Sequence, residues 1–353
     1  MNPEHGNGSR RGVGVRITGV GAEVPPEVIS SDEVERRAGL HRLGFEPGWL
    51  QRVTGVKERH WARDIMPSDL AARAGTKALA AGGVDPLEVD TVVFSGITRD
   101  FLEPATANLV AESVGATKAR VFDVVNACNG VVDGLDIADS LIRTGKAGRV
   151  LVTTGERTSW GINWKPQSVE EAVRSVAALS VGDGGGALLV ERCDDPERGL
   201  REREFRSDAT QWRHAIGGRL QPESQACEHC GGHIVPAFLC NGRALFTSSF
   251  ALLFPMMYSV MERTGWMARD LDVVFCHLPS RRFIDDGLQG IGGLAKFASK
   301  LWQNVERYGN VSTCMLPLAM LQAQEAGVLK PGSKVLVLAP ASGISAAAMT
   351  MVW

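Results

Sequence analysis

Three residues that lie far apart in the chain have side chains and surroundings suited to covalent catalysis: Cys128, His277 and Asn310. Cys128 follows an apolar run and precedes a segment that is expected to be helical. A thiol at a helix N-terminus faces the positive end of the helix dipole and free N–H groups, which favour the thiolate. Because most lone cysteines are small buried hydrophobic residues, this placement alone does not establish a nucleophile.

His277 and Asn310 are ambiguous when each is considered alone. His277 stands where an apolar run meets a turn marked by Pro279, which suits a site residue, but a histidine in such a place is more often half-buried and structural. Asn310 follows Gly309, and a Gly-Asn pair is first of all a turn signal. Together with Cys128, the two residues complete a set that forms a nucleophilic site when a fold brings them together.

The elements that must position these residues alternate between apolar strands and longer helices. Eight runs are predicted as buried strands: Gly14 to Val20, Thr91 to Ser95, Arg120 to Val125, Arg149 to Thr153, Gly186 to Val190, Leu271 to Phe275, Lys334 to Leu338 and Ala346 to Val352. Four stretches are predicted as helices: Ser68 to Ala81, Asn129 to Thr144, Gly242 to Thr264 and Pro317 to Ala326. This alternation indicates an α/β protein whose sheets are covered on both faces.

The two parts of the chain share an arrangement that suggests internal duplication. In each part a strand delivers a polar residue at its end, and a Gly-rich turn lies beside an apolar strand, at 182–187 and at 340–345. The sequence therefore predicts a disordered tail at 1–11 and an N-terminal half at 12–192 that carries the cysteine. A connection with a lid-like insertion is predicted at 193–240, and a C-terminal half with the histidine and asparagine at 241–353.

The bulk composition limits the class of protein. The 353 residues are 44% hydrophobic and carry a net charge of -2, without the basic stripe of a nucleic-acid-binding protein. No apolar run is long enough to predict a transmembrane helix, and the polar N-terminus lacks the apolar core of a secretory signal. Seven scattered cysteines do not suggest a disulfide scaffold, so we expect free thiols in a reducing cytoplasm.

Several ordered motifs resemble one enzyme family. The segments 126–130, 182–187, 307–312 and 330–332, together with His277 and the early segment 49–59, are similar in type and order to β-ketoacyl synthase III, over roughly residues 13–353. The resemblance implies a thiolase fold, with five αβαβα layers from two duplicated halves, in a homodimer. It also implies acyl thioester substrates carried on coenzyme A or an acyl carrier protein, with no cofactor of the enzyme's own.

The resemblance also implies roles for individual residues. Cys128 would be the acylated nucleophile, and His277 and Asn310 would donate hydrogen bonds to the second thioester's oxygen as it becomes an enolate. The backbone N–H groups of Cys128 and Ser342 would form the other oxyanion hole. The family's late turn is usually a run of glycines, whereas this chain has Ala341 and Ser342 before its glycine.

Four further residues would bind the substrate's arm, although the match to the family is incomplete. Trp49 occupies the position of a residue that stacks on adenine, and Arg52 would replace an arginine that the family has where this chain has Val53. Ser280 stands where the family usually has an asparagine, and Arg243 completes the set. Weaker recognition of free coenzyme A would suit a donor bound to a carrier protein.

The segment 99–106 is similar to the dimer loop of head-to-head condensing enzymes, which act in olefin biosynthesis and pyrone formation. Its Glu103 stands where fatty-acid-initiating relatives have a bulky apolar residue. In an apolar pocket this carboxyl would have a raised pKa and could act as a base. The alternative is an exposed loop glutamate before a helix that starts at a proline.

Other interpretations remain open. Cys227, Cys230 and His233, with Cys240, have a metal-like spacing, but a second ligand pair is absent and we expect a plain loop without metal. The main hypothesis is a Claisen condensing enzyme of specialised metabolite or lipid biosynthesis that works through an acyl group on Cys128. It would join either two acyl or β-ketoacyl chains, or an acyl chain and a malonyl unit. The alternatives are an acyltransferase that moves the acyl group to an alcohol or amine, and an inactive subunit that pairs with an active partner.

Overall fold

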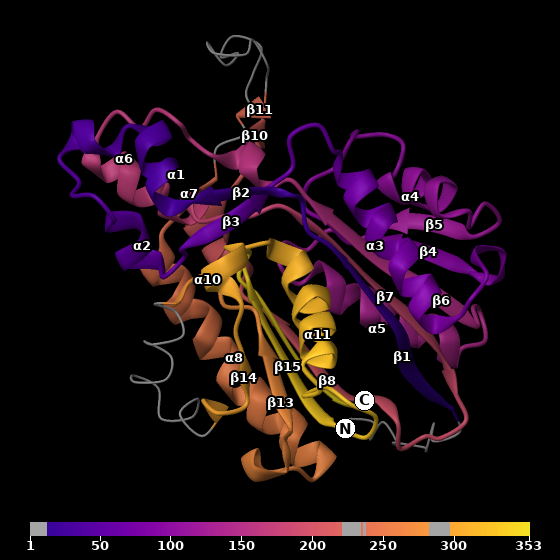
Figure 1. The fold of residues 1–353 in the computed structure, drawn as a ribbon. Helices are drawn as coiled ribbons and strands as arrows, with labels where there is room; N and C mark the ends of the chain where they lie inside the picture. The colour runs from indigo at the N-terminus through magenta and orange to yellow at the C-terminus, as the bar shows by residue number, and fades with distance from the viewer. Residues whose placement is uncertain (1–12, 221–233, 236–237, 282–296) are drawn as a thin grey trace.

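The computed structural model describes residues 13–220, 234–235, 238–281 and 297–353, and its main feature is a ten-stranded mixed sheet (Figure 1). One half of the sheet has the order β5 (Arg120–Asp123), β4 (Thr91–Phe94), β6 (Arg149–Glu156), β7 (Gly184–Cys193) and β1 (Gly14–Glu23). The other half has the order β14 (Leu301–Trp302), β13 (Val273–Cys276), β15 (Lys334–Ala341), β16 (Ser345–Val352) and β8 (Gly199–Ser207). All eight predicted strands are present.

The two halves repeat the same pattern of strand pairing. From the centre of the sheet outward, each half has two antiparallel pairings followed by two parallel ones. The halves join where β1 runs parallel to β8 at Val15 and Gly199. The predicted duplication is therefore confirmed by the topology.

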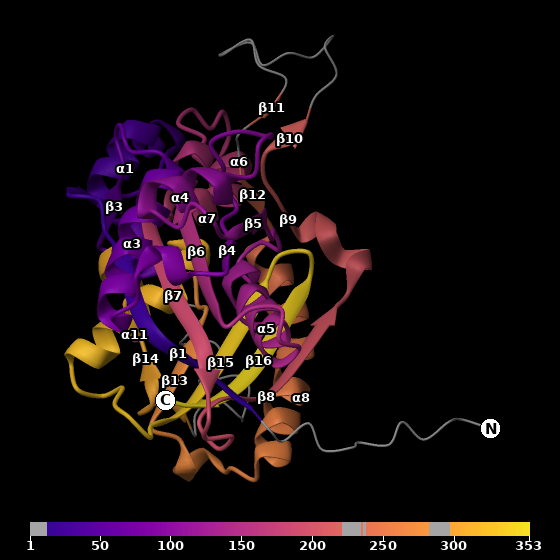
Figure 2. The same ribbon diagram turned by 90° about the vertical axis from the view of Figure 1, so that its right-hand side faces the viewer.

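Helices form the remaining layers (Figures 1 and 2). Helix α3 (Pro67–Gly82) packs on β1, β6 and β7, and α8 (Gly242–Thr264) packs on β8, β15 and β16. Between the halves, α5 (Gly130–Arg143) and α11 (Met315–Glu325) share one apolar core with strands of both. The thiolase architecture of αβαβα layers is thus confirmed, as are the four predicted helices.

Helix α3 approaches β1 closely because that strand has glycines on the contact face. A Cβ atom added at Gly19 would lie 2.0 Å from the Ala78 carbonyl oxygen, and one added at Gly21 would lie 2.0 Å from the Ala74 carbonyl oxygen. Any side chain at either position would push the helix away. The close contact fixes the outer layer of the first half on its sheet.

A smaller cluster of elements, not predicted from the sequence, covers one end of the sheet. It contains the antiparallel hairpin of β2 (Glu27–Ser30) and β3 (Glu58–Trp61), and the helices α1 (Ser31–Ala38), α2 (Trp49–Thr54), α6 (Val169–Arg174) and α7 (Val176–Leu179). Its own apolar core includes Val34, Leu50 and Leu179. This cluster brings the N-terminal segment beside residues 169–181.

The segment 193–240, expected to be a connection and insertion, also contributes to the main sheet. Strand β8 lies in this segment and pairs with β16. It was missed because most of its residues are charged or half-buried: only its first two residues are buried. Further along the segment, β9 (Ala215–Ile216) and β12 (Leu239–Cys240) form a short two-stranded sheet.

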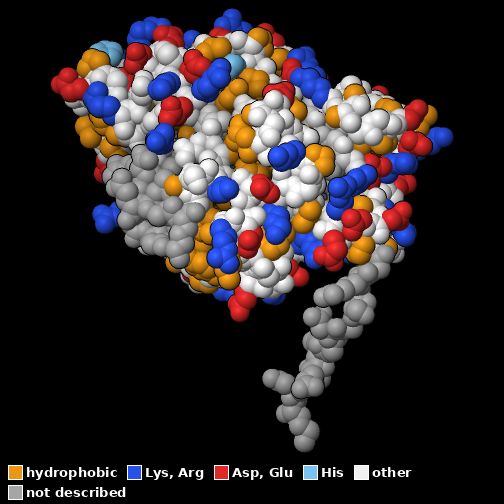
Figure 3. All heavy atoms as spheres, turned by 60° about the horizontal axis from the view of Figure 1, so that its bottom comes forward, with side chains coloured by type: hydrophobic (Ala, Val, Ile, Leu, Met, Phe, Trp, Pro, Cys, Tyr) orange, Lys and Arg blue, Asp and Glu red, His pale blue; other side chains and the backbone are white. Residues whose placement is uncertain are grey.

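Helix α8 is long and apolar enough to cross a membrane by length and composition alone, although the sequence analysis expected no such span. Seven of its residues are buried against strands and neighbouring helices, including Phe250, Leu253 and Met257. We therefore interpret it as a core helix. On the face shown in Figure 3, Lys and Arg side chains lie among Asp and Glu side chains. Arg263 of α8 forms an ion pair with Glu202 of β8 (3.0 Å).

Candidate active site

Cys128 lies in the turn between β5 and α5, directly before the residue that caps the helix. The preceding residue, Ala127, has a left-handed backbone with φ of 45°, which is uncommon for a residue with a side chain. Gly130 begins α5, and a Cβ atom there would lie 2.3 Å from the Ser95 carbonyl oxygen. The glycine thus admits a neighbouring backbone, and the close approach holds the turn against the end of β4.

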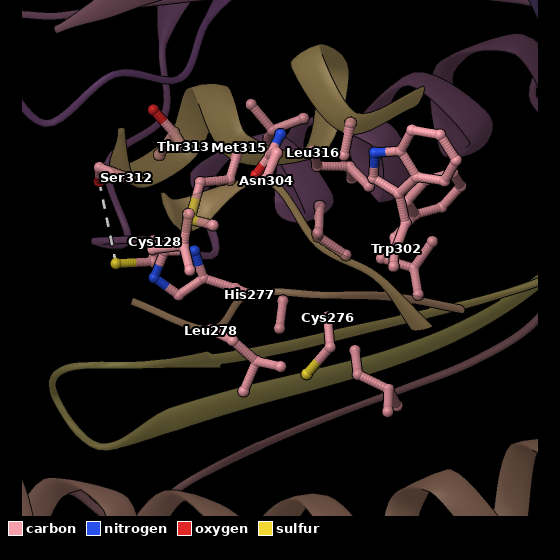
Figure 4. Close-up of a pocket in the computed structure, with 18 of the residues that line it drawn as sticks. Cys128, Cys276, His277, Leu278, Trp302, Asn304, Ser312, Thr313, Met315 and Leu316 are labelled. Atoms are coloured by element: carbon pink, nitrogen blue, oxygen red, sulfur yellow. Dashed lines mark hydrogen bonds between the residues drawn. The ribbon is translucent and has the colours of Figure 1, made fainter. Parts of the chain in front are cut away.

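His277 follows the last residue of β13, and its backbone N–H donates to the Leu338 carbonyl of β15 (2.9 Å). Burial lowers the pKa of the imidazole from 6.5 to about 4. The ring is therefore neutral near pH 7, with one N–H to donate. Figure 4 shows the His277 ring beside Cys128.

Asn310 is fixed by backbone bonds to the first half of the molecule. Its N–H donates to the Ser180 carbonyl (3.0 Å), and its carbonyl accepts from the Gly182 N–H (3.0 Å). Its side-chain Oδ1 accepts from the Ser312 N–H (2.9 Å). Because a backbone N–H can only donate, the amide atom that faces it must be the oxygen of Asn310. The Nδ2 hydrogens of this amide therefore point away from Ser312.

These three residues line one cavity of about 670 Å³. The wall draws on both halves and on the α2 and α7 cluster; it includes Trp49, Cys128, Ser180, Phe238, Cys240, Arg243, His277, Ser280, Asn310 and Ser342. The structure therefore brings together a thiol, an imidazole and an amide from segments that are more than 30 residues apart in sequence. It places Trp49, Arg243 and Ser280 on the same wall, as an arm-binding role requires.

Arg52 is different, because the cavity wall in the described part of the chain does not include it. Its side chain is exposed, and its guanidinium donates to the Pro47 carbonyl (2.8 Å). Arg52 lies in the same short helix as Trp49, α2, but its side chain is on the outer surface of the small cluster of elements. Its substrate-binding role remains a prediction without geometric support in this structure.

The late turn that carries Ser342 connects β15 and β16 at the cavity. Ala341 ends β15 as an ordinary buried strand residue, so the alanine that replaces a family glycine fits its position. The turn is held by a pair of backbone hydrogen bonds between Ile344 and Asp208 (2.9 and 3.2 Å). Behind it, the buried Asn129 amide donates to the Ser345 hydroxyl (3.1 Å), which links the nucleophile turn to the late turn.

The surroundings of Cys128 do not favour a resting thiolate, which the helix start had led us to expect. Burial raises the pKa of the thiol to about 12, and the carboxyl of Glu156 acts in the same direction. The Ser312 hydroxyl, 3.8 Å from the sulfur, acts in the opposite direction. These surroundings favour the neutral thiol over the thiolate near pH 7.

A buried glutamate beside this site was missed in the sequence. Glu156 ends β6 and is fully buried; its carboxyl accepts from the backbone N–H groups of Ile97 (3.0 Å) and Thr98 (3.1 Å) and from the Thr313 hydroxyl (2.5 Å). Burial raises its pKa. The sequence did contain a signal for Glu156: it is an acidic residue shortly after a predicted apolar strand, and site residues often lie at strand ends.

Glu103 does not reach this cavity in the single chain. Its side chain is exposed, on a loop whose start is fixed by the Asp100 carboxylate bonded to the Ser68 N–H (3.0 Å) and hydroxyl (2.5 Å). The neighbouring Phe101 and Leu102 are 56% and 76% exposed. The apolar pocket expected around the Glu103 carboxyl is therefore not formed by this chain alone.

A second, narrow cavity of about 30 Å³ extends from the other side of the nucleophile. Figure 4 shows Cys128, Ser312 and His277 at one end and Trp302 at the other. Its volume suits one or two water molecules rather than an acyl chain. Both cavities share Cys128 and His277, so the nucleophile borders both the wide cavity and the narrow one.

The metal-like cluster lies mainly outside the described residues, since Cys227, Cys230 and His233 all fall within 221–233. Cys240 is described; it is a buried free thiol in the cavity wall. Within the described ranges, no group of three or more potential metal ligands occurs.

Comparisons with known proteins agree with this geometry. A model of 3-oxoacyl-[acyl-carrier-protein] synthase III matches residues 122–209, and a model of that enzyme's C-terminal region matches residues 261–353. The chain is 30% identical over 342 residues to beta-ketoacyl-[acyl-carrier-protein] synthase III of Roseiflexus castenholzii, covering 96% of this chain and 97% of the relative. It is 28% identical over 333 residues to the synthase of the same name from Aquifex aeolicus, covering 94% and 97%.

Solved structures give the same assignment. 3-Oxoacyl-(acyl carrier protein) synthase III of Pseudomonas aeruginosa superposes with a TM-score of 0.84 at 27% identity, covering 96% of this chain and 98% of that one. A variant of OleA from Xanthomonas campestris superposes with a TM-score of 0.85 over 97% and 99%. Its identity is 24%, so this likeness concerns the fold. The chain therefore belongs to the β-ketoacyl-[acyl-carrier-protein] synthase III family of acyl-transferring, thiolase-fold condensing enzymes.

Proposed function

We propose that this enzyme condenses two acyl thioesters, neither of which needs to be a malonyl unit, through an acyl group carried on Cys128. The observation that carries the proposal is the meeting of Cys128, His277 and Asn310 on the wall of one large cavity. A thiol supplies the covalent carrier, and two neutral donors beside it supply stabilisation for an enolate.

In the first half-reaction, the Cys128 sulfur attacks the carbonyl carbon of an acyl thioester. A carbon–sulfur bond to Cys128 forms, the bond to the carrier's sulfur breaks, and the thiol proton ends on the departing carrier thiol. No net proton enters or leaves. The two backbone N–H groups proposed as oxyanion donors, those of Cys128 and Ser342, would hold the carbonyl oxygen while it carries negative charge.

In the second half-reaction, an α-carbanion of the second thioester attacks the acyl carbonyl, and the Cys128 thiolate leaves. The neutral His277 ring offers one N–H, and the Asn310 Nδ2 group is free to donate because its Oδ1 is already bonded to Ser312. Both would donate to the enolate oxygen of the second thioester.

The second substrate needs a base if it carries no carboxyl group to lose. We propose that Glu103 of the partner subunit in a homodimer removes the α-proton. That proton then passes to the Cys128 thiolate that leaves, so that both groups return to their starting states. The exposed Phe101 and Leu102 beside Glu103, and the position of β5 at the end of the sheet, support pairing with a second copy through this edge.

The substrates would arrive on a phosphopantetheine arm, either of coenzyme A or of an acyl carrier protein, with no cofactor resident in the enzyme. Trp49, Arg243 and Ser280 line the wide cavity and supply an aromatic face, a cation and a hydroxyl for the arm. The five described cysteines are free thiols, which suits the reducing cytoplasm in which we propose that the enzyme acts.

The test combines intact-protein mass spectrometry with product analysis. The protein is incubated with a panel of acyl thioesters on coenzyme A and on a carrier protein, and acylated samples then receive malonyl, acyl or β-ketoacyl acceptors. The proposal expects a β-keto product from two non-malonyl thioesters. Products only with malonyl acceptors would contradict the non-malonyl step, and esters or amides formed with added alcohols or amines would favour the acyltransferase alternative.

A further inference from the structure

We propose that Ser312 is a further catalytic residue, whose hydroxyl donates a hydrogen bond to the Cys128 sulfur whenever that sulfur carries negative charge. This inference rests on the proposed function, in which the sulfur becomes anionic twice: when it attacks the first thioester and when it leaves the acyl group. The same residue would orient Asn310 for the second half-reaction.

The contact is direct and enclosed. The Ser312 oxygen lies 3.8 Å from the Cys128 sulfur, a long hydrogen bond even for sulfur, and the serine is 4% exposed (Figure 4). In the described part of the chain, no other side chain makes a hydrogen bond to this sulfur. Ser312 also lines the narrow cavity, so the hydroxyl does not occupy the space through which a substrate would enter.

Backbone strain occurs on both sides of this contact. Among the described residues, only two that are not glycine have a left-handed backbone: Ala127, next to the nucleophile, with φ of 45°, and Ser312, with φ of 52°. Such conformations cost energy and are retained where the surrounding structure enforces them, often at functional sites. The two strained residues come from different halves of the molecule and meet at the sulfur.

Neighbouring bonds prevent Ser312 from turning away. Its N–H donates to the Asn310 Oδ1 (2.9 Å), and the next residue, Thr313, donates from its hydroxyl to the buried Glu156 carboxyl (2.5 Å). Glu156 is itself held by the N–H groups of Ile97 and Thr98. The serine therefore connects the nucleophile to the amide that would hold the enolate, and loss of its position would disturb both.

The electrostatic surroundings explain why such a donor is needed. Three titratable groups face the thiol from different elements: His277 after β13, Glu156 at the end of β6 and Cys240 in β12. His277 is neutral, whereas burial, Glu156 and Cys240 all raise the pKa of Cys128. The Ser312 hydroxyl is the side chain that lowers it. A hydrogen bond to a charged partner is stronger than one to a neutral partner, so its effect grows as the thiolate forms.

The test measures the thiol without any thioester, so that it does not depend on the condensation chemistry. The rate of Cys128 alkylation by iodoacetamide is followed by peptide mass spectrometry from neutral to alkaline pH, because this rate follows the thiolate fraction. Ser312→Ala and Ser312→Gly both remove the hydroxyl, but the glycine relieves backbone strain while the alanine retains it. Both variants should alkylate about tenfold more slowly at neutral pH, with the pH profile displaced upward by about one unit.

The control is Ser333→Ala, which removes a buried serine hydroxyl from the turn before β15, away from both cavities. It should alkylate at the wild-type rate. Unchanged pH profiles of alkylation in both Ser312 variants would overturn the proposal. So would profiles that move in opposite directions in Ser312→Ala and Ser312→Gly, because the effect would then come from the backbone and not from the missing hydroxyl. Displaced profiles together with a wild-type enzyme that forms no β-keto product would support Ser312 while contradicting the proposed condensation.

Discussion

The nucleophile turn (residues 124–130) and the Glu103 loop (residues 97–105) follow the ends of adjacent parallel strands, β5 and β4, yet their surroundings differ. The turn begins at the surface, where Val125 is 51% exposed, but its end is enclosed: Asn129 is 1% exposed and bonds to Ser345 in the other half of the molecule. The loop is fixed at its start by Asp100 and then presents Phe101, Leu102 and Glu103 to the outside.

This difference in exposure indicates which step a single chain could perform and which step would need a second surface. The nucleophile turn has its hydrogen-bond partners within the chain, so we expect acylation to need no second copy. The loop has an apolar surface and a carboxyl group but no cavity of its own to act on. If Glu103 has a chemical role, its site must be completed by another surface, which the proposed homodimer would supply from a second copy of this chain.

The largest effect is expected at the nucleophile turn. Cys128→Ala should abolish the mass increase of one acyl group, because no other residue is proposed to carry the acyl chain. Cys240→Ala is the matched control, since it removes the other thiol of the same cavity and should still be acylated. An undiminished mass shift in Cys128→Ala, detected by intact-protein mass spectrometry, would remove Cys128 from the mechanism.

The next largest effect is expected at the loop. Glu103→Ala should acylate normally but lose about a thousandfold in the condensation of two non-malonyl thioesters, since it would lack the general base. Mixing it with Cys128→Ala protein should restore activity, because a mixed dimer contains one site with both residues intact. Normal condensation by Glu103→Ala would exclude the base role, and absence of rescue after verified subunit exchange would exclude the placement across a dimer.

A smaller effect is expected at the two neutral donors. His277→Ala and Asn310→Ala should still acylate, but each should condense about a hundredfold more slowly, because the enolate that they stabilise exists only in the second half-reaction. Single-turnover measurement of carbon–carbon bond formation from pre-acylated enzyme isolates that step. Wild-type rates in both variants would contradict the triad and favour acyl transfer to another acceptor.

The burial of His277 should also affect how the free energy of unfolding depends on pH. Because burial lowers the pKa of His277 to about 4, the unfolded chain binds a proton between the unfolded pKa near 6.5 and pH 4 while the folded chain does not. Stability therefore decreases as pH falls through this window, by at most about 3 kcal/mol from this group. Asp183, whose pKa burial raises to about 6, acts in the opposite direction in the same window.

His277→Asn separates these contributions, since Asp183 is common to both proteins. Denaturant unfolding at several pH values should show the difference in unfolding free energy between wild type and variant shifting in the variant's favour as pH falls from neutral. A difference that does not change with pH would mean that the imidazole is not desolvated in the folded enzyme.

The smallest effect is expected from metal removal. We predict no stoichiometric zinc at Cys227, Cys230 and His233, because a complete ligand set is not apparent in the sequence. Chelator treatment should therefore leave acylation and thermal stability unchanged. Metal analysis showing one zinc per chain, lost in Cys227→Ser, would contradict this prediction.

The strands and long helices could be predicted because burial on both faces leaves a clear pattern in the sequence. Strands such as β4, with four consecutive buried residues, read as uninterrupted apolar runs. Strand β8 has no such apolar pattern, because its central residues are only half-buried, and it was not predicted. The helices α1 and α2 were not predicted either, because they are short and carry many polar residues. Their positions depend on the packing of the small cluster at the end of the sheet.

By itself, the sequence determined the fold class, the duplication and the identity of the three residues that meet in the cavity, because these depend on apolar periodicity and ordered motifs. Only the tertiary structure decided their chemical state. A helix start suggested a thiolate at Cys128, whereas burial favours the neutral thiol. Glu156 and Ser312 joined the site although neither was predicted as a site residue from the sequence. Desolvation and hydrogen bonding depend on which atoms surround a group in space, and those atoms come from segments that only the completed fold brings together.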